Sequence, residues 1–266
     1  MYRQFFGLKQ TPFGKECTAL WDDGQYENFT QQFNWLLKSP GVGLLTAEPG
    51  LGKTAILRQI TRALNPHQYA VYYIAETDFT RFDIYCQMAI LLGLTPAHRC
   101  SQVWRDIKEC IANSATQKNI LPIFIIDEAH NLPIEFLRDL PSFINFVFDS
   151  KDYMTIWLVG HPELERTINR AQFRALASRI QIRFELQPIT DRDKFKQFIA
   201  HGFAQAGCTH SLLSDSAIEL IRMSSNGNPR SIHVIVVTAL HLAADRNINH
   251  LPDEIIKEAI ESLKHR

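Results

Sequence analysis

The sequence predicts an α/β protein in which helices cover both faces of a five-stranded parallel sheet, followed by a small all-helical domain. Short apolar runs alternate with helical patterns over most of the chain, which is typical of a parallel sheet. After Pro188 the strand signals stop and only helical patterns follow. The chain has 266 residues, of which 45% are hydrophobic and 21% charged, so it can bury one large core or two modest ones.

Five apolar runs carry the predicted strands. Each run is short, nearly continuous and bounded by turn signals, as expected of strands that are buried on both faces. The runs lie at residues 42–47, 69–75, 121–127, 154–160 and 180–186. Helical patterns lie between them, at residues 53–64, 82–94, 103–115 and 134–148. We expect the last of these helices to be interrupted at Pro141.

The C-terminal region divides into four predicted helices. The expected signals are a Thr190/Asp193 capping pattern, a helix from Ser214 to a stop at Gly227, a helix from about Pro229, and a helix in "LPDEIIKEAIESL". The chain is therefore expected to have three parts. These are an N-terminal segment (1–38), an α/β core (39–187) and a helical domain that would act as a lid (188–266).

Charge, targeting signals and cysteine spacing limit the classes of protein to which the chain can belong. The 28 basic and 28 acidic residues cancel, so net charge gives no argument for nucleic acid or for an anionic membrane. There is neither an N-terminal signal peptide nor a run of about 18 apolar residues, so a cytoplasmic protein without a membrane partner is expected. The five cysteines form no C-x-x-C pair, which favours reduced, mostly buried thiols and no metal cage. They are Cys17, Cys86, Cys100, Cys110 and Cys208.

A phosphate-binding loop follows the first predicted strand. "EPGLGKT" (48–54) runs from that strand into a helix, and it matches the P-loop motif except that Ala47 stands where the motif has Gly. We expect Lys53 to reach the β- and γ-phosphates of ATP and the Thr54 hydroxyl to bind Mg²⁺. The alternative is a chance Gly-Lys-Thr turn before a helix. The residues expected to contact ATP are Pro49, Gly50, Leu51, Gly52, Lys53, Thr54 and Ala55.

Two carboxylates end the third predicted strand. "IFIIDE" places Asp127 and Glu128 at the carboxyl end of a buried strand, which is where α/β sheets bind ligands. Asp127 would hold Mg²⁺, and Glu128 would polarise the water that attacks the γ-phosphate. The alternative is an acidic strand end that caps the next helix. The letters "DEAH" (127–130) also match a helicase box, but such helicases need two α/β domains and this chain has room for roughly one.

Three further residues have positions expected of a nucleotide switch. His161 ends the fourth strand and would sense the γ-phosphate or its attacking water, or else is an ordinary loop histidine. Arg179 precedes the last strand and would reach the nucleotide of a neighbouring subunit, or else is a solvated surface arginine. Arg230 lies in the first turn of a helix, where a cation is unfavourable unless an anion faces it. We therefore expect Arg230 to contact phosphate.

Together these motifs resemble those of the AAA+ ATPases. The segments "MYRQFFGLKQTPF", "GLLTAEPGLGKTAILR", "IFIIDEAHNL", "LVGHPEL" and "NGNPRSI" are similar to the ExeA-like group, which includes the transposition regulators TnsC, TniB and IstB. The sequence departs from that pattern at Ala47 and at His161, where Gln is more usual. The resemblance implies that Phe13 lies near the adenine. It also implies that ATP lies at a subunit interface and that the protein forms homo-oligomeric rings or helical filaments.

Two branches of this group suggest different partners. In the transposition branch the oligomer coats double-stranded DNA, recruits or activates a transposase, with or without a target-selection protein, and disassembles on hydrolysis. In the secretion branch a membrane span and a cell-wall-binding domain follow the ATPase, and neither pattern occurs in this sequence. We therefore expect an ATP-dependent DNA-binding regulator of transposition. A secretion-assembly ATPase and an ATP-gated scaffold with little hydrolysis remain as alternatives.

A DNA contact would use loops that face the axis of the oligomer. Phosphate contacts need only Lys, Arg, Thr or backbone N–H donors. The loop "ETDFTRFD" offers Thr77, Thr80 and Arg81, and "TQKN" offers Lys118. The alternative for residues 77–83 is that they cap a helix.

Overall fold

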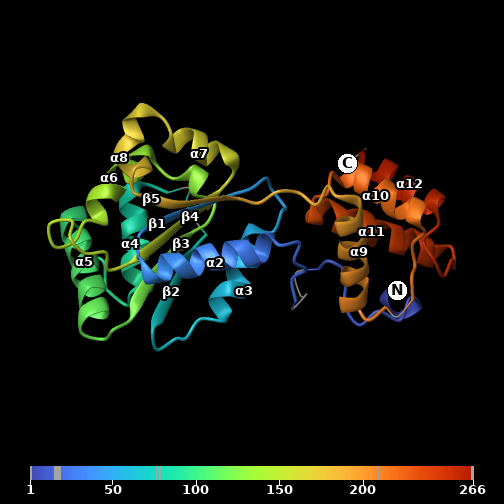
Figure 1. Cartoon of the computed structure of the whole chain (residues 1–266), viewed down its shortest axis with the longest axis horizontal. Helices are drawn as coiled ribbons and strands as arrows, with labels where there is room; N and C mark the ends of the chain where they lie inside the picture. The colour runs from blue at the N-terminus through green and yellow to red at the C-terminus, as the bar shows by residue number, and fades with distance from the viewer. Residues whose placement is uncertain (1, 15–18, 76, 78, 209, 265–266) are drawn as a thin grey trace. The chain divides into compact units, whose positions relative to one another are not determined.

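A computed structural model describes residues 2–14, 19–75, 77, 79–208 and 210–264. Cys17 lies outside these described residues. The chain forms two compact units, coloured mainly blue to yellow and orange to red in Figure 1. The sheet unit comprises Gly24–Pro49 and Ile56–Leu186, and the helical unit comprises Met1–Asp23, Gly50–Ala55 and Gln187–Arg266. Each unit has a hydrophobic core of its own.

The sheet unit contains the predicted five-stranded parallel sheet. Its strands are β1 (Val42–Thr46), β2 (Tyr69–Ile74), β3 (Leu121–Ile126), β4 (Thr155–Gly160) and β5 (Ile180–Glu185), in the order β2-β3-β4-β1-β5. Every pair is parallel, with Thr46 opposite Gly160 and Ile126 opposite Leu158. The carboxyl ends of β1, β3 and β4 therefore lie at the same end of the sheet, and the segments that follow these strands start there. The predicted fold class is confirmed.

The expected burial on both faces holds for the three central strands but is wrong for the two edge strands. All residues of β1 and β4 are buried, and so are five of the six residues of β3. In β5 buried and exposed residues alternate, and β2 is buried only at Ile74. An edge strand is covered less completely than a central one. On β5, the ring of Phe184 packs against the ring of Phe29, which lies on one helix.

Seven helices of the sheet unit surround the sheet, and several of them had no counterpart in the sequence prediction. The helices at 53–64, 82–94, 103–115 and 134–148 were predicted, whereas α2, α7 and α8 were not. The bounds are α2 (Gln25–Lys38), α3 (Lys53–Arg62, whose first turn belongs to the helical unit), α4 (Arg81–Leu91), α5 (Cys100–Thr116), α6 (Ile134–Phe143), α7 (Pro162–Ile168) and α8 (Arg174–Ala177). Short 3₁₀ turns lie at Ala129–Asn131 and Ala171–Phe173.

The two faces of the sheet pack against different helices because successive strand residues point to opposite faces. On one face, Phe124 and Leu158 belong to a large core that includes α4, α5 and α6. On the other face, the Trp157 ring stacks on Phe33 of α2 with ring centroids 5.2 Å apart and an interplanar angle of 3°. Helix α2 is thus fixed to the centre of the sheet.

Gly43 makes room for the Trp157 ring across the β1–β4 pair. A β carbon on Gly43 would lie 2.5 Å from Cζ3 of Trp157, a side chain that is fully buried. We expect Gly43→Ala to destabilise the sheet unit by about 1–3 kcal/mol, since overpacking a tight core costs this much. The midpoint of urea unfolding, followed by tryptophan fluorescence, would measure the loss. An unchanged midpoint would mean that the ring shifts without cost.

The predicted interruption of a helix at Pro141 is wrong. Helix α6 continues through Pro141 and ends at Phe143. Proline costs a helix the hydrogen bond of its missing N–H. Here that loss falls in the last turn, where few further bonds depend on it, and Leu140 and Phe143 are fully buried on either side. Packing therefore outweighs the local signal.

The helical unit contains the four helices expected after Pro188. They are α9 (Arg192–Gln205), α10 (Asp215–Ser225), α11 (Pro229–Asp245) and α12 (Asp253–Lys264), and a short helix α1 (Tyr2–Phe5) accompanies them. The predicted Thr190/Asp193 capping pattern is wrong. Asp191 caps α9 instead, where its side chain accepts a hydrogen bond from the Lys194 N–H at 2.9 Å. That residue is three positions away, which is the spacing that the cap requires.

The expected N-terminal segment (1–38) is divided between the units, because Met1–Asp23 belong to the helical unit whereas Gln25–Lys38 form α2 of the sheet unit. Tyr2, Phe6 and Leu8 share a core with the four C-terminal helices. The Phe13 ring lies 5.1 Å from that of Phe198 on α9. Among the described residues, no helix is both long and apolar enough to cross a membrane. The four described cysteines are free thiols, as expected, but they are of intermediate burial rather than mostly buried.

Candidate functional site

Ala47 fits at the end of β1 without strain. Its side chain is fully buried, and its backbone N–H donates a hydrogen bond to the Gly160 carbonyl oxygen at 3.1 Å. This bond extends the β1–β4 pairing by one residue. The backbone of Ala47 does not take a positive φ, so the position does not require glycine. The departure from the P-loop motif therefore falls where a methyl group is tolerated.

The loop after β1 has the backbone that a phosphate-binding loop needs. Gly50 and Gly52 have φ values of 89° and 99°, which other residues rarely adopt. Lys53 is only 6% exposed and begins α3, and Thr54 is the next residue of that helix. Backbone N–H groups at a helix N-terminus bind anions. The contacts of these residues with ATP stay a prediction, and the local geometry favours them.

Arg230 lies close to this loop within the helical unit. A β carbon on Gly50 would lie 2.7 Å from both the Arg230 Cβ and the Asn228 Oδ1. Asn228 is the N-cap of α11, and its Oδ1 accepts the Arg230 N–H at 3.0 Å. The "GNPR" segment therefore opens a helix beside the P-loop glycine. This placement supports the predicted phosphate contact of Arg230.

Asp127 is held at the carboxyl end of β3. It is 3% exposed, and its Oδ2 accepts a hydrogen bond from the Tyr73 hydroxyl of the neighbouring strand at 2.8 Å. Its Oδ1 accepts the Glu128 N–H at 2.9 Å. Thr54 offers a hydroxyl and Asp127 a carboxylate, and Mg²⁺ prefers oxygen ligands, so the chemistry of each residue by itself fits the predicted role. The sequence prediction missed Tyr73, because nothing in an apolar strand marks one hydroxyl as a partner of Asp127.

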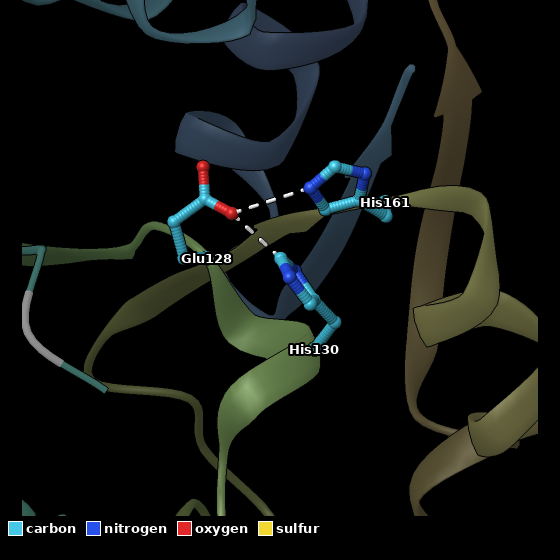
Figure 2. Close-up of side chains that lie close together, drawn as sticks. All are labelled: Glu128, His130 and His161. Carbon is cyan, nitrogen blue, oxygen red and sulfur yellow. Dashed lines mark ion pairs between the residues drawn. The ribbon is translucent and has the colours of Figure 1, made fainter. Parts of the chain in front are cut away.

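Glu128 projects from a strained backbone position toward two histidines (Figure 2). Its φ is 51°, which is uncommon for a residue other than glycine. Its Oε2 lies 3.5 Å from the His130 Nδ1 and 3.5 Å from the His161 Nε2. The Glu128 side chain is 46% exposed. A carboxylate that is anchored by its backbone and reaches solvent suits the predicted role of polarising a water molecule.

The structure brings the predicted residue His161 to Glu128 and adds His130, which sequence reasoning missed. His161 is the N-cap of α7, directly after β4. His130 lies in the 3₁₀ turn after β3, and its ring meets that of His161 edge to face, with centroids 4.2 Å apart. The sequence signal for His130 is the last letter of "DEAH", a motif that by itself indicates only a helicase box.

The predicted DNA loop is tied to Glu128. Thr77 is 2% exposed, and its hydroxyl donates to the Glu128 carbonyl oxygen at 2.9 Å. Thr80 and Asp83 form a capping box at the start of α4, as the alternative interpretation expected. Arg81 pairs with Asp139 at 2.9 Å, and Lys118 is exposed. DNA contacts of these residues stay a prediction.

Arg179 is held on the surface of the sheet unit by a bidentate ion pair. Its two terminal nitrogens donate to the two carboxylate oxygens of Asp149 at 2.8 and 2.9 Å. These hydrogen bonds lower the pKa of Asp149 and raise the pKa of Arg179, so both groups are charged at neutral pH. The Arg179 side chain is 29% exposed. It is therefore accessible to a second molecule, and its role toward a neighbouring nucleotide stays a prediction.

Comparison with known proteins identifies one family and a set of similar folds. Residues 36–168, half of the chain, match the family described as AAA domain. The chain is also similar to General secretion pathway protein A of Aeromonas hydrophila, with 28% identity over 252 residues. That similarity covers 92% of this chain but 45% of the relative, so the chain spans less than half of the relative's length.

Two Aeropyrum pernix proteins have similar structures. The ORC2 protein, solved in ADPNP–ADP complexes, has a TM-score of 0.69 at 15% identity, over 97% of this chain and 71% of that one. The ORC1 protein, solved in complex with DNA, has a TM-score of 0.68 at 14% identity, over 93% of this chain and 66% of that one. At such low identity the similarity shows the fold alone.

Proposed function

This chain belongs to the AAA domain family, has the AAA+ P-loop fold and is an ATPase. We propose that it is an ATP-dependent regulator of transposition. In this proposal the protein acts in the cytoplasm and belongs to the same group as the TnsC, TniB and IstB regulators. ATP drives its assembly into a ring or filament on double-stranded DNA. The assembly recruits or activates a transposase, and hydrolysis releases it.

In the proposed hydrolysis, different residues bind the phosphates, activate water, hold Mg²⁺ and act on the neighbouring subunit. Lys53 and the N–H groups of the loop around Gly50 and Gly52 hold the phosphates, and Arg230 contacts them from the start of α11. Glu128 polarises the attacking water, with its main chain anchored by Thr77. Mg²⁺, held by Thr54 and Asp127, would neutralise charge on the phosphates when bound. Arg179 acts on the nucleotide of a neighbouring subunit, and Phe13 lies near the adenine.

The observation that carries the DNA part of the proposal is the hydrogen bond from Thr77 to the Glu128 carbonyl. It links the loop that would face DNA directly to the residue that would activate water. A shift of this loop on DNA would therefore alter the position of Glu128. This gives DNA a physical route to ATP turnover. The ORC1 protein, which has a similar fold, was solved in complex with DNA.

Duplex dependence tests the proposal. We expect electron microscopy with a non-hydrolysable ATP analogue to show ordered assemblies only when duplex DNA is present. Binding should weaken with salt, with a slope of about −0.9 for each phosphate contact on a plot of log affinity against log salt. Lys118→Ala should reduce that slope by about 1, whereas Lys38→Ala, an exposed lysine on α2, should not. Assembly with ATP but no DNA binding at low salt would overturn the DNA proposal.

A second candidate function is secretion assembly through a membrane partner. It is favoured by the similarity to General secretion pathway protein A over 92% of this chain. In this case the same ATP site would drive assembly, but duplex DNA would change neither assembly nor turnover. The experiment above therefore separates the two candidates.

A further inference from the structure

We propose that Glu128, His130 and His161 form a binding site for Zn²⁺. One ligand atom from each residue lies within 4.8 Å of the other two. The Glu128 Oε2 lies 3.5 Å from the His130 Nδ1 and 3.5 Å from the His161 Nε2 (Figure 2). The expectation of no metal cage rested on the cysteines alone, and this group contains none. The site goes beyond the proposed function and needs neither DNA nor a transposase.

The distances suit a tetrahedral ion. With Zn–N and Zn–O bonds of about 2.0–2.2 Å, neighbouring ligand atoms of a tetrahedron lie roughly 3.3–3.6 Å apart. Both separations from the Glu128 Oε2 already have this value. One nitrogen of each histidine ring lies within 4.8 Å of one nitrogen of the other, so this third separation would have to shorten for both rings to bind one ion. Three protein ligands would leave the fourth position to water, as in zinc sites that stay open.

The donor set distinguishes Zn²⁺ from Mg²⁺. Imidazole nitrogen is a preferred ligand of zinc and related transition metals, whereas Mg²⁺ takes oxygen ligands. Two histidines and one carboxylate are therefore a poor Mg²⁺ site and a suitable Zn²⁺ site. The oxygen donors Thr54 and Asp127, which fit Mg²⁺, are a separate set. The two ions would thus not compete for the same ligands.

The ligands are partly organised before the ion arrives. Glu128 and His130 flank Ala129, a fully buried residue, and the Glu128 carbonyl is fixed by the buried Thr77. His161 caps α7 at the end of the adjacent strand. The His130 and His161 side chains are 20% and 25% exposed, so both rings reach the surface, whereas the His130 Nδ1 itself is buried.

Bound Zn²⁺ would inhibit ATP hydrolysis. The ion would take the Glu128 oxygen that otherwise polarises water, and this consequence rests on the role proposed above for Glu128. Binding itself does not rest on that role. The two statements can therefore be tested apart.

Zinc titration of the metal-free full chain, without nucleotide or Mg²⁺, tests the site. Competition with a chromophoric chelator should reveal one site that His130→Gln or His161→Gln weakens by more than about 100-fold, because loss of even an outer partner of a zinc ligand costs about 10- to 100-fold. His98→Gln, which removes an exposed histidine elsewhere in the sheet unit, should bind like the parent. Parent-like binding by the His130 and His161 variants would overturn the proposal. Binding of the ion by thiols would give this same result.

The thermal midpoint gives a second measurement that does not depend on activity. Zn²⁺ should raise the midpoint of the parent and of His98→Gln, because an ion that binds the folded chain stabilises it. It should not raise the midpoint of folded His130→Gln. An equal rise in that variant would again contradict the site. Zinc binding without DNA-dependent assembly would leave this inference standing while the proposed function fails.

Discussion

Replacing Glu128 by Gln should stop ATP turnover while leaving ATP binding intact. The amide matches the carboxylate in size but cannot accept a proton from water. A positioned general base contributes about 10²- to 10⁴-fold, so we expect phosphate release to fall by about that factor. The measurement is steady-state phosphate release at saturating Mg²⁺ and ATP with duplex DNA. Binding of a fluorescent ATP analogue should match that of the parent.

The same variant should remain assembled in ATP, because hydrolysis is the proposed signal for release. The matched control is Glu135→Gln, an exposed carboxylate in the first turn of α6. That control should hydrolyse ATP and disassemble like the parent. If Glu128→Gln disassembled at the parental rate, hydrolysis would not be the switch. The protein would then act as an ATP-gated scaffold.

The strands could be predicted because each is a short apolar run between turn signals. Burial on each face could not, because it depends on strand order. The order β2-β3-β4-β1-β5 puts β2 and β5 at the edges, and no local pattern states that order. Helix α2 could not be predicted for a related reason. Its buried face includes Phe29 and Phe33, which pack against Trp157, a residue far away in the sequence.

The candidate site divides in the same way. Lys53 and Asp127 lie in contiguous motifs whose spacing is set by a strand and the turn after it, so sequence alone could single them out. Tyr73 and Thr77 act through hydrogen bonds to residues more than fifty positions away. His130 contacts Glu128 because a 3₁₀ turn brings its ring back toward the strand end. The contacts of Tyr73 and Thr77 arise from tertiary folding, whereas that of His130 depends on the conformation of a local turn.

Arg179→Ala should leave ATP binding by the isolated chain unchanged and remove turnover that depends on assembly. An arginine supplied by a neighbouring subunit stabilises the charge of the transition state, and its loss costs about 10³-fold or more. The measurement is phosphate release as a function of protein concentration, with duplex DNA present. The parent should accelerate as it assembles, and the variant should not. Equal turnover in both assembled proteins would remove Arg179 from the site.

The ion pair with Asp149 sets the controls for this test. In the single chain Arg179 is occupied by Asp149, and an exposed pair of this kind is easily exchanged for another anion. Asp149→Asn should therefore retain assembly-dependent turnover, because it frees the guanidinium and removes only its resting partner. Arg183→Ala is the matched arginine control, since Arg183 pairs with Glu165 at 3.1 Å and has a side-chain exposure of 32%. If that control lost as much turnover as Arg179→Ala, the effect would reflect general loss of surface charge rather than a specific role in the neighbouring site.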